Sequence, residues 1–314
     1  MLKKILLLSA LSGMILASGC IKDDLDSCPP GVELSFEYVL NNEETDLFAA
    51  QVNKVTVYAF DQAGLYLGTF TESGSSLAQP GYKLTLPLEP GKYTLLTLGG
   101  PLTGYTIAPL AEGQTSIDDF LVLLNQVSPG VGTSPSELFY AKNTVDVLPQ
   151  KKTQVKASLL KNTSRVVFRI REDGVENSPV EHQYELFLTG TNNQIDKDND
   201  IPADAPELRY NSQPFTVSGN VYETHVDLMR LVLGNPVYIS LMHPGFDGPI
   251  LSADLLELLK ARGYLTQIAL DKEDLFIIEI IIPAPGPGPD PDPKLTVTVK
   301  VNGWTVIVVY AEKD

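Results

Sequence analysis

The chain has 314 residues, of which 23 are Lys or Arg and 39 are Asp or Glu, so its formal net charge at pH 7 is −16. Such an acidic surface argues against binding of nucleic acid and against electrostatic adhesion to anionic lipid head groups. The composition is that of a globular protein without a long disordered tract, and the length suggests two domains.

The first twenty residues are typical of a secretory signal and not of a membrane-spanning helix. Lys3 and Lys4 form a short basic start, residues 5–16 are mostly apolar, and small residues precede Cys20. The apolar run is shorter than the roughly 20 residues that a bilayer core requires. Small residues before a cysteine resemble a bacterial lipobox, in which the bond between Gly19 and Cys20 is cut and the cysteine is acylated. The alternative is an ordinary cleaved signal with a free or disulfide-bonded Cys20.

Residues 20–30 are predicted to form a lipidated tether. The chain contains two cysteines, Cys20 and Cys28, which are too few for a zinc site with about four ligands. If Cys20 carries lipid on its sulfur, Cys28 is either a free thiol or bridges to another chain. Cleavage after residue 19 removes two lysines and changes the formal net charge from −16 to −18. Because so acidic a chain is not attracted to anionic lipid head groups, the protein would be held at the membrane by its covalently attached lipid.

Residues 31–155 are expected to form an N-terminal β-sandwich domain. Short runs rich in β-branched and aromatic residues alternate with Gly- or Pro-containing turns, as in an antiparallel sandwich. One short helix is predicted at residues 116–126, where Ser116 caps the first turn and Leu121 and Leu124 face inward. The expected strands are 31–40, 54–61, 65–71, 82–88 and 92–100.

Residues 156–314 are expected to form a C-terminal β-sandwich domain, so the fold class is all-β, two tandem antiparallel sandwiches with minor short helices. We place the boundary near residues 150–162. The apolar pattern of residues 254–264 predicts an amphipathic helix that ends at Gly263. The expected strands are 152–161, 164–172, 184–190, 236–243 and 275–283.

The C-terminal end contains a spacer and a hairpin. Residues 283–293 are rich in Pro and Gly and are expected to be extended and semi-rigid. Residues 294–310 predict a β-hairpin, because two alternating apolar runs flank Asn302 and Gly303, the strongest short-range hairpin signal. An isolated hairpin is marginal in water, so this one is expected to pack on the second domain or on another subunit.

No arrangement of residues predicts catalysis. The three histidines, His182, His225 and His243, are far apart in the sequence. The sequence contains no nucleophile elbow, no zinc-protease helix motif and no phosphate-binding glycine loop. The chain is therefore predicted not to be an enzyme and to use no cofactor other than the covalent lipid.

One acidic loop is a weak candidate for a calcium site. Five carboxylates fall at positions 1, 3, 5, 9 and 12 of an EF-hand-like count. Position 6 is Ile201 where the sharp turn requires Gly, and Pro202 and Pro206 stiffen the loop. A solvated acidic loop is therefore the alternative to calcium binding. The five carboxylates belong to Asp196, Asp198, Asp200, Asp204 and Glu207.

Several short motifs together resemble the FimB-type fimbrial anchor and minor-subunit lipoproteins of Bacteroidota. The motifs are C-x-K-D-D-L-x-x-C-P at residues 20–29, V-T-V-Y-A-F-D-x-x-G at 55–64, an N/D-rich loop after residue 190 and V-N-G-W at 301–304. The resemblance implies two transthyretin-like sandwiches at the base of a pilus. A retained lipid would hold the fibre on the outer membrane, and fimbrial stalk or accessory subunits would pair with the anchor by β-strand addition.

The same resemblance gives a role to the segment that follows Cys20. Lys22, Asp23 and Asp24 are similar to the short charged signal of surface-exported Bacteroidota lipoproteins. In that system an arginine-specific protease removes the N-terminal segment of stalk subunits. This chain has no arginine before Arg165, which favours an anchor that keeps its lipid.

Two other functions stay open. The chain could be a tip or accessory adhesin of the same fibre, or a surface lipoprotein that binds glycans. Glycan platforms use exposed aromatic residues, and the sequence has a single tryptophan, Trp304, beside thirteen tyrosines. For the anchor, the hairpin at residues 294–310 is the predicted pairing edge.

Overall fold

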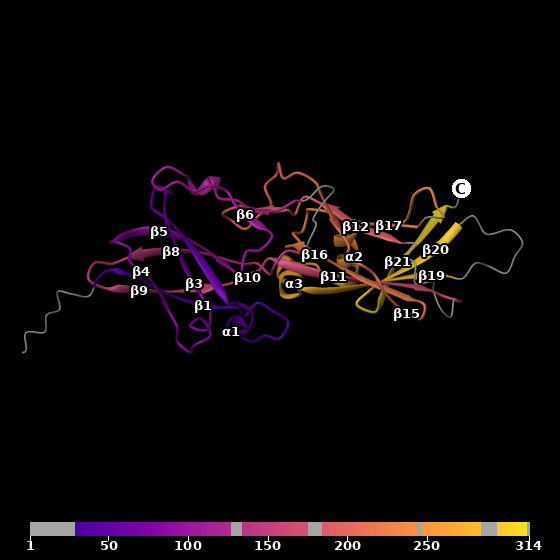
Figure 1. Cartoon of the computed structure of the whole chain (residues 1–314), viewed down its shortest axis with the longest axis horizontal. Helices are drawn as coiled ribbons and strands as arrows, with labels where there is room; N and C mark the ends of the chain where they lie inside the picture. The colour runs from indigo at the N-terminus through magenta and orange to yellow at the C-terminus, as the bar shows by residue number, and fades with distance from the viewer. Residues whose placement is uncertain (1–28, 127–133, 175–183, 244–245, 284–293, 313–314) are drawn as a thin grey trace, which may run out of the picture.

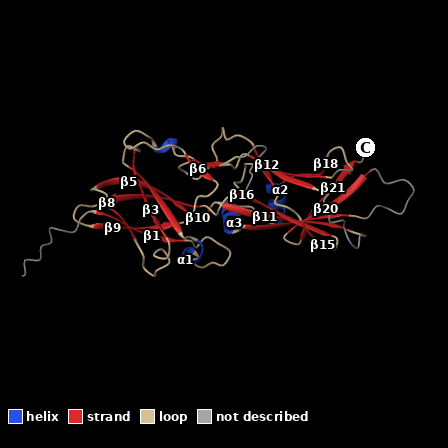
Figure 2. Ribbon diagram, in the orientation of Figure 1, coloured by secondary structure: helices blue, strands red, loops and turns tan. Residues whose placement is uncertain are grey.

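The computed structural model describes residues 29–126, 134–174, 184–243, 246–283 and 294–312. The predicted signal and the residues Gly19, Cys20, Lys22, Asp23, Asp24 and Cys28 lie outside these ranges. The described chain forms two β-domains that follow one another along the long axis of the molecule (Figure 1). The prediction of an all-β fold with minor short helices is confirmed (Figure 2).

Two sheets and one short helix make the first domain. Strand β1 lies between β4 and β9 in a three-stranded sheet, and a second sheet has the order β10-β8-β5-β2-β3. The bounds are β1 (Gly31–Glu37), α1 (Phe48–Gln51), β2 (Lys54–Phe60), β3 (Tyr66–Ser73), β4 (Leu84–Leu86), β5 (Gly91–Gly99), β8 (Phe139–Val147), β9 (Lys152–Ser158) and β10 (Leu160–Lys161).

The central strand β2 is apolar on both faces because each face is covered. Val55 and Val57 point to one side and pack in the core of the first domain. Tyr58 and Phe60 point to the other side and belong to the cluster that continues into the second domain. Since successive side chains of a strand alternate between faces, the near-continuous apolar run of β2 reflects burial on both sides.

The second domain also consists of two sheets. Its six-stranded sheet has the order β15-β16-β11-β19-β20-β21, and its four-stranded sheet has the order β14-β12-β17-β18. The bounds are β11 (Thr163–Glu172), β12 (Glu185–Gly190), β14 (Leu208–Asn211), β15 (Thr216–Ser218), β16 (Val221–Met229), β17 (Val237–Met242), β18 (Pro249–Asp254), α2 (Leu255–Arg262), α3 (Gln267–Lys272), β19 (Leu275–Ile282), β20 (Lys294–Val301) and β21 (Trp304–Glu312).

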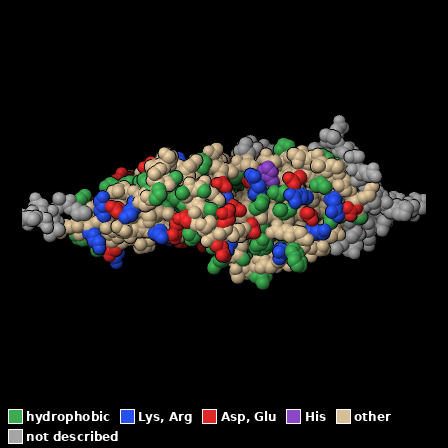
Figure 3. All heavy atoms as spheres, turned by 90° about the horizontal axis from the view of Figure 1, so that it is seen from below, with side chains coloured by type: hydrophobic (Ala, Val, Ile, Leu, Met, Phe, Trp, Pro, Cys, Tyr) green, Lys and Arg blue, Asp and Glu red, His purple; other side chains and the backbone are tan. Residues whose placement is uncertain are grey.

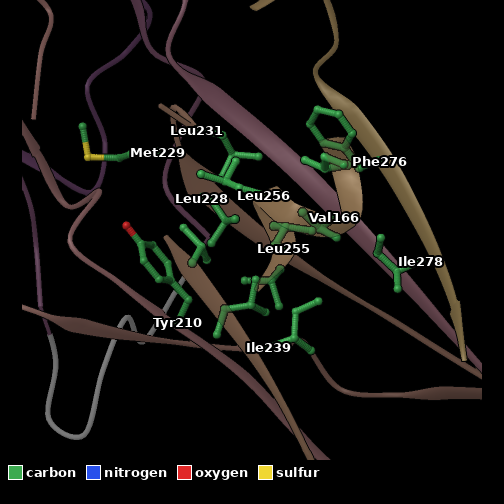
Figure 4. Packing of buried hydrophobic residues seen from close by; sticks show 14 of the residues in the cluster. Val166, Tyr210, Leu228, Met229, Leu231, Ile239, Leu255, Leu256, Phe276 and Ile278 are labelled. Atoms are coloured by element: carbon green, nitrogen blue, oxygen red, sulfur yellow. The ribbon is translucent and has the colours of Figure 1, made fainter. Parts of the chain in front are cut away.

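The helix α2 and the two sheets share one core (Figure 4). Val166 of β11, Ile239 of β17, Leu255 of α2 and Ile278 of β19 are all fully buried. Burial of each such side chain stabilises the fold by about 1.5–3 kcal/mol. The predicted helix at 254–264 is confirmed, with the Asp254 carboxylate accepting a hydrogen bond from the N–H of Leu256 and Gly263 ending the helix at φ 118°.

The sheets depart from the predicted antiparallel arrangement at two places. In the first domain β1 runs parallel to β9, and in the second domain β11 runs parallel to β19. Parallel neighbours require a long connection, and here most of the other strands of each domain lie between the two that pair. Both domains therefore place their first strand beside a late one.

The predicted helix at 116–126 is wrong for most of its length. Only Ile117–Asp119 form a helical turn, capped as predicted by the Ser116 hydroxyl, which accepts a hydrogen bond from the N–H of Asp118. The following strand β7 (Val122–Leu124) pairs with β6 (Tyr105–Ile107) and with β13 (Gln194–Ile195). Leu121 is half-buried instead of facing the core, because burial here alternates with the period of a strand.

The sheets of the first domain run past the predicted boundary at residue 155. All residues of β9 to Ser158 pair with β1, and β10 pairs with β8. Beyond Lys161 the chain enters β11, the first strand of the second domain.

The C-terminal hairpin forms as predicted and packs on the second domain. Asn302 and Gly303 have φ values of 46° and 80°, the left-handed pair that a type I′ turn requires. Strand β20 pairs with β19, and β21 pairs with β20. Of the predicted spacer at 283–293, only Pro283 lies within the described residues.

Candidate assembly surface

The last strand of the six-stranded sheet, β21, has an open edge. It pairs with β20 on one side, and among the residues that the structure describes no strand pairs with its other side. Residues 305–311 contain no charged side chain and no proline. Exposed strand edges are usually guarded by lysine, proline or a bulge. The pairing of β21 with β20 shifts register at Val306, and the residues beyond this irregularity, 307–311, carry no lysine or proline and form the open edge that could template another strand.

The turn that precedes β21 is tied to the body of the domain. The Asn302 side chain accepts a hydrogen bond from the N–H of Ile277 at 2.9 Å and donates one to the Tyr264 hydroxyl at 3.0 Å. The Tyr264 ring packs edge-on against Phe276. Burial raises the pKa of Tyr264, and the nearby Glu273 adds to the shift. The hairpin is further held by Val297, Val299 and Val301, whose side chains are fully buried.

The start of the first domain lies at the opposite end of the molecule from this edge (Figure 1). There Gly31, the first residue of β1, pairs with Lys152 of β9. A Cβ on Gly31 would come within 2.7 Å of the carbonyl oxygen of Leu86, so the chain enters the domain against the backbone of β4. The predicted tether therefore joins the end of the molecule that is remote from β21.

The two domains meet through strand pairing on one side. Ile195 of β13 pairs with Val122 of β7, and both side chains are buried. The side-chain amides of Asn162 and Asn199 are hydrogen-bonded to each other, and the Tyr140 hydroxyl donates to the carbonyl oxygen of Lys197. A single apolar cluster runs through this junction.

Polar contacts join the domains on the other side. Asn42 donates a hydrogen bond to Glu273 at 2.7 Å, and Lys272 forms an ion pair with Glu44 at 2.9 Å. Acidic side chains gather near the middle of the face in Figure 3. With strand pairing on one side and these contacts on the other, the two domains are held as one elongated unit.

The acidic loop predicted as a weak calcium candidate takes part in this junction. An oxygen of Asp196 accepts hydrogen bonds from the N–H groups of Asp198 and Asp200, at 2.8 and 3.0 Å. Asp198 pairs with Lys142 of the first domain and with Lys197, and these lysines lower the pKa of its carboxyl.

The remaining predicted ligands, Asp204 and Glu207, are exposed. Within the described ranges, which include all five carboxylates, no group of three or more His, Cys, Asp or Glu residues is placed to hold a metal ion. The structure thus does not bring the five carboxylates together, and Asp196 and Asp198 instead shape the loop and bind lysines.

A cleft of about 240 Å³ lies where the domains meet, and its two basic side chains are both paired with carboxylates. Lys161 sits between Glu137 and Asp274 at 2.6 Å from each, and Arg165 pairs with Asp227. His225 lies 3.8 Å from Asp227.

The described residues include no helix with the length and apolar character that a bilayer crossing demands. Two joined β-sandwich domains with an open sheet edge at one end define a class of protein that can associate with a partner by strand addition. The sequence profile of the family described as fimbrillin-A associated anchor proteins Mfa1 and Mfa2 matches residues 25–310, so the chain belongs to this family. This family consists of fimbrial anchor proteins and is not a family of enzymes.

Individual relatives agree with this membership. The chain is 25% identical over 268 residues to the minor fimbrium anchoring subunit Mfa2 of Porphyromonas gingivalis, which covers 82% of this chain and 80% of that protein. The crystal structure of the fimbrial anchor protein Mfa2 from the same organism has a TM-score of 0.74 at 22% identity, over 89% of this chain and 100% of that one. A candidate polysaccharide-binding protein from Bacteroides thetaiotaomicron has a TM-score of 0.76 at 22% identity, over 88% and 96% of the two chains. The predicted resemblance to fimbrial anchor lipoproteins of Bacteroidota is confirmed at the level of the family.

Proposed function

We propose that this protein anchors the base of a fimbria to the outer membrane through a lipid on Cys20 and pairs with a stalk subunit through β21. The observation that carries the proposal is the placement of the two attachment points. The chain enters β1 at one end of the molecule, and the open edge of β21 belongs to the domain at the other end (Figure 1). An anchor needs this separation, because one end must stay at the membrane while the other receives the fibre.

The tether explains how the membrane end would be held. Cleavage between Gly19 and Cys20 leaves residues 20–30 between the lipid and the first strand. Fully extended, this segment spans at most about 35 Å, so the first domain stays close to the membrane. Lys22, Asp23 and Asp24 would direct the protein to the cell surface. The absence of arginine before Arg165 supports a tether that an arginine-specific protease leaves intact.

Strand addition at β21 explains how the fibre end would be held. A partner strand would receive backbone hydrogen bonds along an edge of nine residues, Trp304–Glu312. The sequence T-V-I-V-V-Y-A at residues 305–311 is apolar at nearly every position, which is typical of a strand covered on both faces. A partner that continues the six-stranded sheet would remove the open edge from water.

Metabolic labelling tests the membrane attachment. Wild-type protein is expected to incorporate a labelled fatty acid, and the Cys20→Ala variant is expected to carry no label and to release fibres into the medium. Protease shaving of intact cells should remove the wild-type protein if it is exposed at the surface. A wild-type protein without label would overturn the lipid anchor.

Gatekeeper lysines test the strand edge. The double change Thr305→Lys and Ala311→Lys places charge at both ends of β21. Cells that carry this variant are expected to shed their fibres, although the variant protein stays folded. Thr69→Lys, on the exposed edge strand β3, is the matched control and should keep fibres on the cell. Immunogold labelling should find the protein at the base of each fibre; labelling at the tip would identify an accessory adhesin instead. Retention of fibres by the double variant would show that β21 is not the pairing edge.

A further inference from the structure

We infer that Trp304 and Arg262 form a recognition site that accepts a carboxylate-bearing strand of a fimbrial subunit at the start of the β21 edge. This inference rests on the proposed use of β21 for strand addition, and it names the chemistry that such a strand must carry. Neither residue was assigned this role from the sequence, because Arg262 and Trp304 are 42 positions apart and meet only in the folded protein.

Trp304 is exposed at the position where a partner strand would begin to pair. It is the only tryptophan of the chain, it is the first residue of β21, and 65% of its surface is accessible. A tryptophan at an open edge offers a partner a large apolar ring together with one N–H donor. Tryptophan and arginine are the residues most enriched among those that dominate the energy of protein interfaces.

Arg262 lies against this tryptophan from the end of α2. Its guanidinium carbon is 5.1 Å from the centre of the Trp304 ring, a cation–π contact. The Nε–H group is buried and has no hydrogen-bond partner among the described residues. A buried donor without a partner is rare in native proteins and calls for an explanation.

Arg262 also differs from every other arginine of the chain. Each of the other five forms an ion pair with a carboxylate, whereas Arg262 forms none within the described part of the chain. The chain has 39 acidic residues, so an arginine without a carboxylate is unusual here. The five pairs are Arg165–Asp227, Arg169–Glu223, Arg171–Asp173, Arg209–Glu185 and Arg230–Asp271.

The chemistry of this pair selects a carboxylate. The terminal N–H groups of a guanidinium match the two oxygens of a carboxylate. The chain as a whole, with a formal net charge of −16, repels acidic groups. A strand with one Asp or Glu is therefore favoured only where that residue meets Arg262.

The pair would also set the register of the added strand. A slip by one residue turns every side chain of a strand to the opposite face of the sheet. The carboxylate would then point away from Arg262. One charged contact at the start of β21 thus selects one alignment of an otherwise apolar edge.

The test uses fibres sheared from the parent bacterium as the probe and the full chain with Cys20→Ala as the immobilised protein. Arg262→Glu should weaken fibre binding about 10- to 100-fold, the loss typical of a charge-assisted contact, and Arg262→Lys should weaken it less. Wild-type binding should weaken with added salt, and the Arg262→Gln variant should lose most of this salt dependence. Lys260→Glu, on the same helix, is the matched control for a change of charge and should bind like the wild type.

Two outcomes would overturn the inference and spare the proposed function. One is wild-type binding by Arg262→Glu while the Thr305→Lys, Ala311→Lys double variant fails to bind. The other is equal salt dependence for Arg262→Gln and the wild type. If the double variant also binds normally, the edge itself is not used and the proposed function fails. Circular dichroism of the free protein confirms that each variant is folded.

Discussion

Arg230 holds Asp271 through two parallel hydrogen bonds, each 2.8 Å long, from Nε and one terminal nitrogen to the two carboxylate oxygens. The side chains are only 12% and 7% exposed. The other terminal nitrogen of Arg230 donates to the carbonyl oxygen of Asn199 at 2.9 Å. The guanidinium thus connects helix α3 to the acidic loop at the domain junction.

Removal of Asp271 should destabilise the protein strongly. Asp271→Ala leaves a buried arginine without its carboxylate, which typically costs about 3–5 kcal/mol. Urea denaturation followed by circular dichroism measures the change. The exposed pair Lys260–Glu257, at 2.6 Å, provides the control, because Lys260→Ala should change stability by less than about 1 kcal/mol. A loss below that level for Asp271→Ala would contradict the buried pair.

The junction strand should make the two domains unfold together. Ile195→Ala removes a buried side chain from β13 and is expected to cost about 2–5 kcal/mol. Because β13 pairs with β7 of the first domain, this change should also split a single thermal transition into two. Ile268→Ala is the control, since that side chain is 63% exposed. Two transitions already present in the wild type would argue against a coupled junction.

The contacts across the junction should weaken in acid. Lys142 and Lys197 lower the pKa of Asp198, and Lys272 lowers the pKa of Glu44. A lowered pKa in the folded state adds stability above the ordinary carboxyl pKa of about 4, and this stability is lost as the pH falls through the lowered value. Asp198→Asn should therefore melt below the wild type at pH 6 and at the same temperature near pH 2. A difference that is independent of pH would exclude this linkage.

The hairpin turn should depend on its asparagine side chain. Asn302→Ala leaves the N–H of Ile277 without its acceptor and the Tyr264 hydroxyl without its donor, at a cost of about 1–3 kcal/mol. Gly303→Ala should cost about 1–2 kcal/mol because φ is 80° there. Fluorescence of Trp304 during denaturation reports on this region directly. Thr305→Ala, an exposed change in the same hairpin, should have little effect.

Local sequence patterns correctly predicted the elements whose formation depends on a few neighbouring residues. The hairpin at Asn302–Gly303 and the helix capped by Asp254 and Gly263 form where the sequence places them. The helix expected at 116–126 failed because a short apolar run fits a strand as well as a helix, and the pairing of β7 with β6 and β13 decided between them. The strands β8 and β16, which have neighbours on both sides in their sheets, were not predicted, although buried and polar residues alternate along β16 as in a half-exposed strand.

The candidate site was only partly accessible to sequence reasoning. The sequence predicted the hairpin as a pairing edge, and the structure adds that β21 is the outermost strand of its sheet. The spacing of Asp196, Asp198 and Asp200 suggested metal ligands, whereas lysines at the junction bind Asp198. No sequence signal relates Arg262 to Trp304, because their contact depends on how α2 packs beneath the hairpin.

The amino-acid sequence by itself determined the all-β class, the turn of the hairpin, the acidic charge and the absence of arginine before Arg165. These properties depend on neighbouring residues or on composition, so the distance between segments in space does not affect them. Only the tertiary structure decided the parallel pairs β1–β9 and β11–β19, the junction through β13 and the contact of Arg262 with Trp304. Each of these joins segments far apart in the chain, and their register follows from the packing of the whole core.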